Sequence, residues 1–383
     1  MKQFTIIVKV TNNCNLSCSY CYEGDNFSSH FIEWETVQNT ILKTLDYVDP
    51  ETTIKFIWHG GEPLLIGLDF YEKIIDLQEK VGKGQKIINS IQTNGILLSE
   101  RIIKFLIENN FRIGISIDGP PIIHDSQRLF SNNQGSFDQV FKSVLILRKY
   151  YANSDNRISA ISVFTKNTYN HLDEFYNFFK NQKINVKINP LLMSGRANLN
   201  YFRQNLFITP YEFGSGLINL FEKWIAEDEY VFNIEPFKNV IMSMVTGNTF
   251  SCIFSGHCYD RYLSINPHGD IVPCGRWNSD QFLYGNINFD SIETSLNSFD
   301  CYRFKQQRII AENKCKKCKY FGICHGGCPF SGYLRRSNLS DPDYYCEGYK
   351  MLFSHIEHKL KDLLLMDGQS NSIVSQKGIE DYE

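Results

Sequence analysis

The chain has 383 residues and a formal net charge of −3, so it is long enough for two domains and has no excess of basic residues for binding nucleic acid. It lacks a secretory signal and any apolar run near the roughly 20 residues that span a bilayer, which predicts a cytoplasmic protein without a membrane partner. Its twelve cysteines, several at C-x2-C or C-x3-C spacing, indicate metal or cluster ligands rather than disulfides.

Residues 1–208 alternate short apolar runs with amphipathic segments. We predict helices near 33–47, 68–80, 100–109, 136–150 and 172–181, and strands near 4–10, 54–58, 87–92, 112–117, 158–164 and 186–189. Strands and helices in this alternating order predict an α/β fold, with a parallel sheet that curls into a partial (β/α)6 TIM barrel. The active site of such a barrel forms where its strands end.

The remainder of the chain divides into four stretches. Residues 209–250 are predicted to form a helical bridge, which begins with Thr209 and Pro210 in the cap and first-turn positions and ends at Gly247. Residues 251–348 are cysteine-rich and irregular, and residues 349–366 form a terminal helix. Residues 367–383 are polar without a periodic apolar face, and we expect them to be disordered.

Three cysteines, Cys14, Cys18 and Cys21, follow the first predicted strand within eight residues. Three thiolates held this closely can each bind one iron of a cubane cluster and leave the fourth iron open to a small molecule. The alternative is a zinc knuckle or a group of free cysteines.

Polar turns follow the next three strands. They read His59-Gly60-Gly61-Glu62-Pro63, then Thr93-Asn94-Gly95, then Ser116-Ile117-Asp118-Gly119. Each is an ordinary strand-to-helix turn when taken alone, but three in succession at one rim offer donors and acceptors for an amino-acid head group. We expect the glycine pair to let the backbone approach a ligand closely. His124 and Arg128, on the loop that follows, are also candidates to face the ligand, but we expect them to lie on a solvated loop.

A second group of cysteines comprises Cys252, Cys258, Cys274, Cys315, Cys318, Cys324, Cys328 and Cys346. Eight thiols are enough for two fully ligated 4Fe-4S clusters, although a C-x2-C-x5-C-x3-C run alone would also suit zinc. The twelfth cysteine, Cys301, fits neither set and is expected to be a buried structural thiol.

The first cysteine motif, with Tyr20 as the aromatic residue of C-x3-C-x-aromatic-C, resembles that of the radical SAM enzymes, and the second group resembles their SPASM domain. The resemblance implies S-adenosyl-L-methionine and three 4Fe-4S clusters, the first of them on Cys14, Cys18 and Cys21. It implies one auxiliary cluster on Cys252, Cys258, Cys274 and Cys328, and another on Cys315, Cys318, Cys324 and Cys346. It also implies cofactor contacts from Tyr20, Gly60, Gly61, Glu62, Pro63, Asn94, Ser116 and Asp118.

This resemblance predicts an oxidoreductase that acts on a peptide or protein and receives electrons from a donor such as flavodoxin or ferredoxin. In anaerobic sulfatase-maturing enzymes an Asp general base follows the cysteine that matches Cys274, and a Gln precedes the Gly-Gly-Glu-Pro turn. Here these positions are Gly275 and His59. We therefore expect a peptide maturase that forms a thioether, carbon-carbon or carbon-oxygen cross-link in a ribosomally made peptide.

Two alternatives remain at this point, namely oxidation of Cys or Ser to formylglycine in a sulfatase, and a non-catalytic iron-sulfur or zinc protein. The first strand begins too early for a leader-recognition domain before it. We therefore expect either a separate leader-binding protein as a further partner, leader binding at the sheet edge of the SPASM region, or a reaction without a leader. The candidate catalytic residues are Asp280, His59 and Arg276, and further candidate substrate contacts are Tyr22, Glu23 and Trp277.

Overall fold

A parallel sheet forms the centre of the computed structural model, which describes residues 3–24, 30–82, 84–152, 157–227 and 231–367. The stretch 368–383, within which we expected disorder, lies outside the described residues. Six strands pair in chain order, as predicted: β1 (Gln3–Lys9), β2 (Thr53–His59), β3 (Ile87–Thr93), β4 (Arg112–Ser116), β5 (Ser159–Phe164) and β6 (Asn185–Pro190). Their carboxyl ends therefore meet at one rim.

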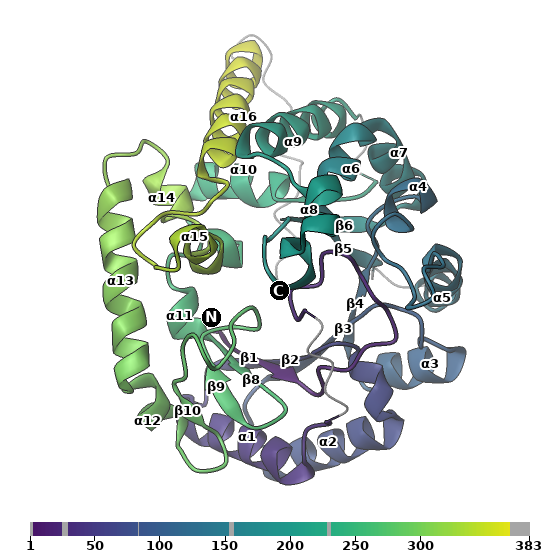
Figure 1. Cartoon of the computed structure of the whole chain (residues 1–383), viewed down its shortest axis with the longest axis vertical. Helices are drawn as coiled ribbons and strands as arrows, with labels where there is room; N and C mark the ends of the chain where they lie inside the picture. Colours follow the sequence, from purple (N-terminus) through teal and green to yellow (C-terminus); the bar gives the residue numbers. More distant parts are fainter. Residues whose placement is uncertain (1–2, 25–29, 83, 153–156, 228–230, 368–383) are drawn as a thin grey trace.

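Helices cover the outer face of this sheet, as Figure 1 shows. The predicted helices are confirmed as α1 (Trp34–Tyr47), α2 (Leu68–Val81), α3 (Glu100–Glu108), α5 (Phe137–Tyr151) and α7 (Leu172–Gln182). Short turns η1 (Pro63–Ile66), α4 (Pro121–His124) and α6 (Lys166–Asn170) lie between strands and helices. Each helix buries one apolar face, which in α2 includes Phe70, Tyr71 and Ile74, and the rings of Phe70 and Tyr71 pack against the fully buried Trp58.

The sheet is wider than the sequence indicated, because strands are added at both of its edges. Strand β7 (Ile234–Glu235) pairs with β6, and β8 (Tyr262–Ile265), β9 (Asp270–Val272) and β10 (Gly285–Asn286) extend the sheet beyond β1. β8 runs parallel to β1, whereas β9 pairs antiparallel with β8, and β10 pairs antiparallel with β9. The start of the cysteine-rich region therefore continues the barrel sheet, and this satisfies the backbone hydrogen bonds along the edge of β1.

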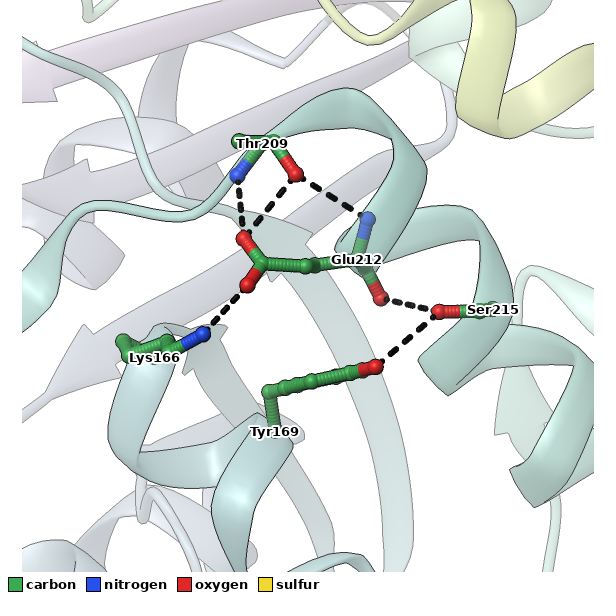
Figure 2. A network of polar contacts seen from close by, with 5 residues as sticks. All are labelled: Lys166, Tyr169, Thr209, Glu212 and Ser215. Carbon is green, nitrogen blue, oxygen red and sulfur yellow. Dashed lines mark hydrogen bonds and ion pairs between the residues drawn. The ribbon is translucent and has the colours of Figure 1, made fainter.

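The predicted bridge, residues 209–250, contains α9 (Pro210–Ile225) and α10 (Phe237–Thr246); η2 (Gly195–Asn198) and α8 (Asn200–Leu206) precede it, within the stretch assigned to the barrel. Figure 2 shows how α9 begins: Thr209 accepts a hydrogen bond from the backbone N–H of Glu212, and the Glu212 carboxylate accepts from Thr209 in return. The same carboxylate is ion-paired with Lys166 of α6, and Ser215 donates to the hydroxyl of Tyr169. These contacts fix α9 against the barrel.

The cysteine-rich region is built from short helices around one long one. They are η3 (Cys252–Phe254), α11 (Cys258–Arg261), α12 (Ile292–Leu296), α13 (Phe299–Cys315), α14 (Phe321–Cys324) and α15 (Pro329–Arg336). The last helix, α16 (Cys346–Asp367), packs on α9, where the ring centroids of Phe213 and Tyr349 are 5.4 Å apart in an edge-to-face arrangement. Cys301 is fully buried in α13, as predicted. In the described part of the chain, no helix combines the length and the apolar character needed to cross a bilayer.

Candidate active site

A cavity of about 1140 Å³ occupies the barrel interior and opens between the two cysteine groups. Its lining includes Cys14, Cys18 and Cys21 from the loop after β1, and Cys252, Cys258, Cys274 and Cys328 from the cysteine-rich region. The five other cysteines of that region, Cys301, Cys315, Cys318, Cys324 and Cys346, do not line it. A molecule in this cavity would therefore contact the first cysteine loop on one side and one of the two later sets on the other.

The thiols of the first loop lie close together and away from water. Burial raises the pKa of Cys14 to about 12 and that of Cys21 to about 11, and the neighbouring Cys18 adds to both shifts. The side-chain amide of Asn94 lies 3.6 Å from the Cys14 sulfur and can donate to it. Thiols with raised pKa values become ligands only when a metal stabilises the thiolate, and N–H donors to sulfur are typical of cluster sites. The residues therefore fit an iron-sulfur cluster.

The glycine pair after β2 lets two stretches of backbone meet. The N–H of Gly61 donates to the carbonyl of Thr11 at 2.8 Å, and the N–H of Glu62 donates to the carbonyl of Asn13 at 2.9 Å. A Cβ on Gly60 or Gly61 would overlap these carbonyl oxygens. We expected the pair to admit a ligand, and the structure shows a second reason for it: only glycine allows the cysteine loop to dock on the end of β2.

Glu62 is fully buried behind the cavity wall. Its carboxylate accepts hydrogen bonds from Thr93 Oγ1 (2.7 Å) and from the backbone N–H groups of Asn94 (2.8 Å) and Leu64 (3.1 Å). Burial raises its pKa to about 7 although these hydrogen bonds lower it. Glu62 therefore connects the carboxyl-terminal ends of β2 and β3. Gly60, Gly61 and Asn94 line the cavity in front of it.

A buried polar network connects the cysteine loop to β4 and β5. The Tyr20 hydroxyl donates to Asp118 Oδ2 at 2.6 Å, Arg128 Nη1 donates to that hydroxyl at 2.6 Å, and Asp118 Oδ1 accepts from the N–H of Val163 at 2.9 Å. Asp118 is fully buried and Arg128 is 6% exposed. Tyr20, Ser116 and Arg128 line the cavity, whereas Asp118 lies behind it.

The prediction that His124 and Arg128 lie on a solvated loop is wrong. His124 is fully buried, and its Nε2 lies 3.0 Å from Ser136 Oγ, which in turn donates to the carbonyl of Arg128. Burial lowers the pKa of His124 well below its usual value, so the imidazole is neutral. The loop is buried because its charged member, Arg128, has partners in the protein interior, a fact that residue type alone does not reveal.

On the opposite wall, the thiols of Cys252, Cys258, Cys274 and Cys328 lie near one another. Burial raises the pKa of Cys274 to about 11 and that of Cys258 well above its usual value, and the neighbouring thiols add to both. Arg276 Nη1 lies 3.3 Å from the Cys328 sulfur, which accepts its hydrogen bond. This set therefore pairs Cys328 with cysteines far from it in sequence.

The remaining set lies outside the cavity. Burial raises the pKa of Cys346 to about 11 and that of Cys324 further, with contributions from neighbouring thiols of the same set. Asp343 orders the adjoining loop by accepting from the N–H of Cys328 (2.9 Å) and the hydroxyl of Ser331 (2.6 Å). In the described residues, no three potential ligand side chains converge as the ligands of a single ion would. In a cubane each thiolate binds a different iron, so such convergence is not needed.

The other candidate residues divide between the cavity and the surface. Tyr22, Glu23, His59, Arg276 and Trp277 all line the cavity, although Trp277 is mostly enclosed by aromatic rings. Asp280 is exposed and does not line the cavity.

Sequence reasoning missed two buried arrangements at the candidate site, the ion pair between Lys9 and Glu23 and the network around Arg128. The only signal for Lys9 was a charged residue at an inward position of an apolar strand.

Comparisons with known proteins agree with this arrangement. Residues 8–179 match the sequence profile of the radical SAM superfamily, and residues 252–319 match SPASM, an iron-sulfur cluster-binding domain. The chain belongs to the radical SAM superfamily. It is an oxidoreductase that acts on a peptide or protein, and its cofactors are S-adenosyl-L-methionine and 4Fe-4S clusters. The non-catalytic interpretation is therefore not retained.

The relatives of this radical SAM enzyme extend over nearly its whole length. A cysteine-type anaerobic sulfatase-maturating enzyme of Clostridium novyi is 29% identical over 94% of this chain and 97% of the relative. A serine-type enzyme of Bacteroides thetaiotaomicron is 29% identical over 92% of this chain and 89% of its own. The structure of native anSMEcpe with bound AdoMet and Cp18Cys peptide superposes with a TM-score of 0.82 at 28% identity, covering 94% of this chain and 98% of that one.

These relatives correct one prediction. The expectation of a cross-linking peptide maturase is wrong, because the similarity over the whole of this radical SAM enzyme is to sulfatase-maturating enzymes of both types. That expectation rested on two positions, His59 and Gly275. Differences at two positions of one cavity are compatible with a different placement of acid-base groups for the same reaction, so they carried too much weight.

Proposed function

We propose that this enzyme oxidises a Cys or Ser side chain of a sulfatase-type protein to formylglycine. The observation that carries the proposal is the similarity over more than nine-tenths of the chain to both cysteine-type and serine-type anaerobic sulfatase-maturating enzymes. The cavity supports it, because a substrate side chain placed there lies between two cysteine sets. Such a position suits a reaction in which a hydrogen atom leaves on one side and an electron on the other.

Under this proposal Cys14, Cys18 and Cys21 hold the cluster that binds S-adenosyl-L-methionine, and the two later sets hold auxiliary clusters. The cofactors supply a radical that removes a hydrogen atom from an unactivated C–H bond, together with an acceptor for the substrate's electron. The chain positions the substrate and excludes water from the cavity. Tyr20, Gly60, Gly61, Asn94 and Ser116 are the proposed cofactor contacts that line the cavity.

Three further residues expected at the cofactor act from behind these contacts. Glu62 and Asp118 have their oxygens occupied by protein donors, and Pro63 begins the turn η1. Their role in this proposal is to keep the loops after β2, β3 and β4 in place. Preorganised loops reduce the free-energy cost of binding a cofactor in one orientation.

The two auxiliary sets have different roles in the proposal. Cys252, Cys258, Cys274 and Cys328 line the cavity, so a cluster there would receive the substrate electron first. The set with Cys315 lies farther out and would pass the electron on. A separate donor such as flavodoxin or ferredoxin and a cytoplasmic location remain part of the proposal. A leader-binding protein was expected only for the cross-linking reaction and is not required here.

The test is anaerobic reconstitution with iron and sulfide, followed by incubation with S-adenosyl-L-methionine, dithionite and sulfatase peptides that contain either Cys or Ser. Mass spectrometry is expected to show two hydrogens lost from the Ser peptide, and sulfur replaced by oxygen with loss of two hydrogens in the Cys peptide. Both products react with a hydrazine probe because they contain an aldehyde.

Two variants make this test specific. Cys14→Ala is expected to abolish 5′-deoxyadenosine and aldehyde together. Cys301→Ala is the matched control, because Cys301 is a buried cysteine outside the three sets, and it is expected to retain both products. Formation of 5′-deoxyadenosine without aldehyde from either peptide, or a cross-linked product, would contradict the proposed function.

A further inference from the structure

A buried arginine lies at the loop that joins the two auxiliary cysteine sets. The inner set, which lines the cavity, consists of Cys252, Cys258, Cys274 and Cys328, and the outer set consists of Cys315, Cys318, Cys324 and Cys346. Arg308, on α13, is 1% exposed. Its Nη2 donates to the carbonyl oxygens of His325 (2.8 Å) and Gly327 (3.4 Å). These carbonyls belong to the loop that runs from Cys324 of the outer set to Cys328 of the inner set.

Part of this guanidinium has no acceptor in the protein. Nε and Nη1 of Arg308 are buried and have no hydrogen-bond partner among the described residues. Glu312 Oε1 lies 3.9 Å from Nε, which is beyond hydrogen-bond distance, and it too has no partner in the described part of the chain. A buried charged group with unsatisfied donors is strongly unfavourable and rare in native proteins. The arrangement therefore indicates an acceptor that completes this site.

The outer cysteine set lies next to the guanidinium. Gly326, in the same loop, has a φ of +82°, and a Cβ added to it would lie 3.2 Å from Arg308 Nη2 and 3.6 Å from the Cys315 sulfur. Because glycine has no Cβ, the guanidinium and this thiol face one shared space. A 4Fe-4S cluster on the outer set would carry negative charge and sulfur atoms that accept hydrogen bonds. The donors of Arg308 that lack a partner fit such a group.

We propose that Arg308 donates hydrogen bonds to the outer cluster and raises the reduction potential of that cluster relative to the inner one. This inference rests on the two auxiliary clusters of the proposed function. The electron that leaves the substrate radical reduces the inner cluster, and its transfer outward reduces the outer cluster while the inner one is reoxidised. A fixed positive charge stabilises the reduced, more negative form of the nearer cluster. Arg308 therefore favours movement of the electron away from the substrate.

The exposed lysines beside the outer set are expected to contribute less. Lys314 and Lys319 are 52% and 64% exposed, and they are paired with Asp341 and Glu357. Water and salt screen charges at exposed positions, whereas a buried charge acts through a medium of lower polarity. We therefore expect a larger effect on the outer cluster from Arg308 than from either lysine.

The experiment measures the reduction potentials of both auxiliary clusters in the reconstituted full chain. Replacing Cys14, Cys18 and Cys21 together by Ala removes the first cluster and its EPR signal. The two remaining signals are assigned with Cys315→Ala and Cys328→Ala. A redox titration followed by EPR then gives each potential. No peptide is present, so the measurement does not depend on formylglycine formation.

Variants at Arg308 and its neighbours give opposite shifts. Arg308→Gln is expected to lower the equilibrium constant for reduction of the outer cluster at least about tenfold, which is about 59 mV for one electron. It should change the inner cluster less. Arg308→Lys retains the charge and should give less than about half of this shift in potential. Glu312→Gln removes the carboxylate beside Nε and should make the outer potential more positive.

Lys314→Gln is the matched control, because it removes a positive charge next to the same cysteine set at an exposed position. It is expected to change the equilibrium constant by less than about threefold. Iron content is measured for every variant. A purely structural role for Arg308 would change iron content or stability without shifting the potential of the loaded outer cluster.

The inference is overturned if Arg308→Gln changes the outer equilibrium constant by less than about twofold, or shifts the inner cluster as much as the outer one. If both Arg308 variants lose the iron of the outer cluster, Glu312→Gln decides, and an outer potential that does not become more positive would overturn the inference. A wild type without the two auxiliary signals would overturn both clusters and this inference together. The expected shifts in an enzyme that forms no aldehyde would overturn formylglycine formation alone and would support the role of Arg308.

Discussion

Replacing Arg128 by Met tests whether the buried network behind the cysteine loop stabilises the barrel. Arg128 donates to the Tyr20 hydroxyl at 2.6 Å, and its charge faces Asp118, which is fully buried. Met preserves the apolar stem but removes the charge and the donors. Removing one member of a buried charge network costs about 3 to 5 kcal/mol, because the remaining charge is left without compensation.

This free energy corresponds to a measurable change in the unfolding temperature. The unfolding entropy is about 2.1 cal/mol/K per residue, which for a chain of 383 residues amounts to about 0.8 kcal/mol/K. The apparent unfolding temperature of Arg128→Met should therefore fall by about 4 to 6 °C. Anaerobic differential scanning fluorimetry of the cluster-loaded protein measures it. Arg101→Met, at an exposed arginine of α3, is the matched control and should change it by less than about 1 °C.

A double variant distinguishes the network from simple loss of packing. If the cost of Arg128→Met comes from the uncompensated Asp118 charge, then Asp118→Asn with Arg128→Met should be less destabilising than the sum of the two single variants. Additive effects, or a change of less than about 1 °C for Arg128→Met alone, would refute the reasoning.

Three further predictions concern charge and cluster content. Arg276→Gln should make the reduction potential of the cavity-facing auxiliary cluster more negative, because the guanidinium that donates to the Cys328 sulfur is lost. An EPR-monitored redox titration measures this potential, and an unchanged potential would contradict the assignment of Cys328 to that cluster. Cys328→Ala and Cys315→Ala should remove different EPR signals, and loss of the same signal would refute the two cysteine sets. The buried Glu62 has a pKa raised from 4.5 to about 7, so its neutral form stabilises the fold at low pH, and this stability is lost as pH rises through 7. The wild type should therefore lose up to about 3 kcal/mol relative to Glu62→Gln between pH of about 5 and about 8, and parallel unfolding curves would exclude this.

The radical SAM barrel could be predicted because its evidence is local in the sequence. The periodicity of apolar residues located six strands and five helices, and the spacing of Cys14, Cys18 and Cys21 indicated a cluster with an open iron. Such patterns are readable because a helix or strand repeats its buried face at a fixed interval, and because ligands of one cluster on one loop must be close in sequence.

Other features depend on contacts between residues far apart in the chain. The pairing of β8 with β1, the burial of Arg128 and the ion pair between Lys9 and Glu23 have no periodic or local signature. The substrate class was misjudged for a related reason. Gly275 showed that one expected base was absent, and the sequence already named Glu23 as a candidate substrate contact, but only the folded chain pairs Glu23 with Lys9 at the cavity wall.

The sequence by itself therefore determined the barrel, the cysteine spacing and the type of cofactor chemistry, because each follows from residue types at short fixed intervals. The tertiary structure decided which cysteine set faces the cavity, which polar residues are buried, and which of them pair with each other at the cavity wall. Burial and electrostatic pairing are set by what surrounds a side chain in three dimensions, and those neighbours come from strands and loops that are distant in the sequence.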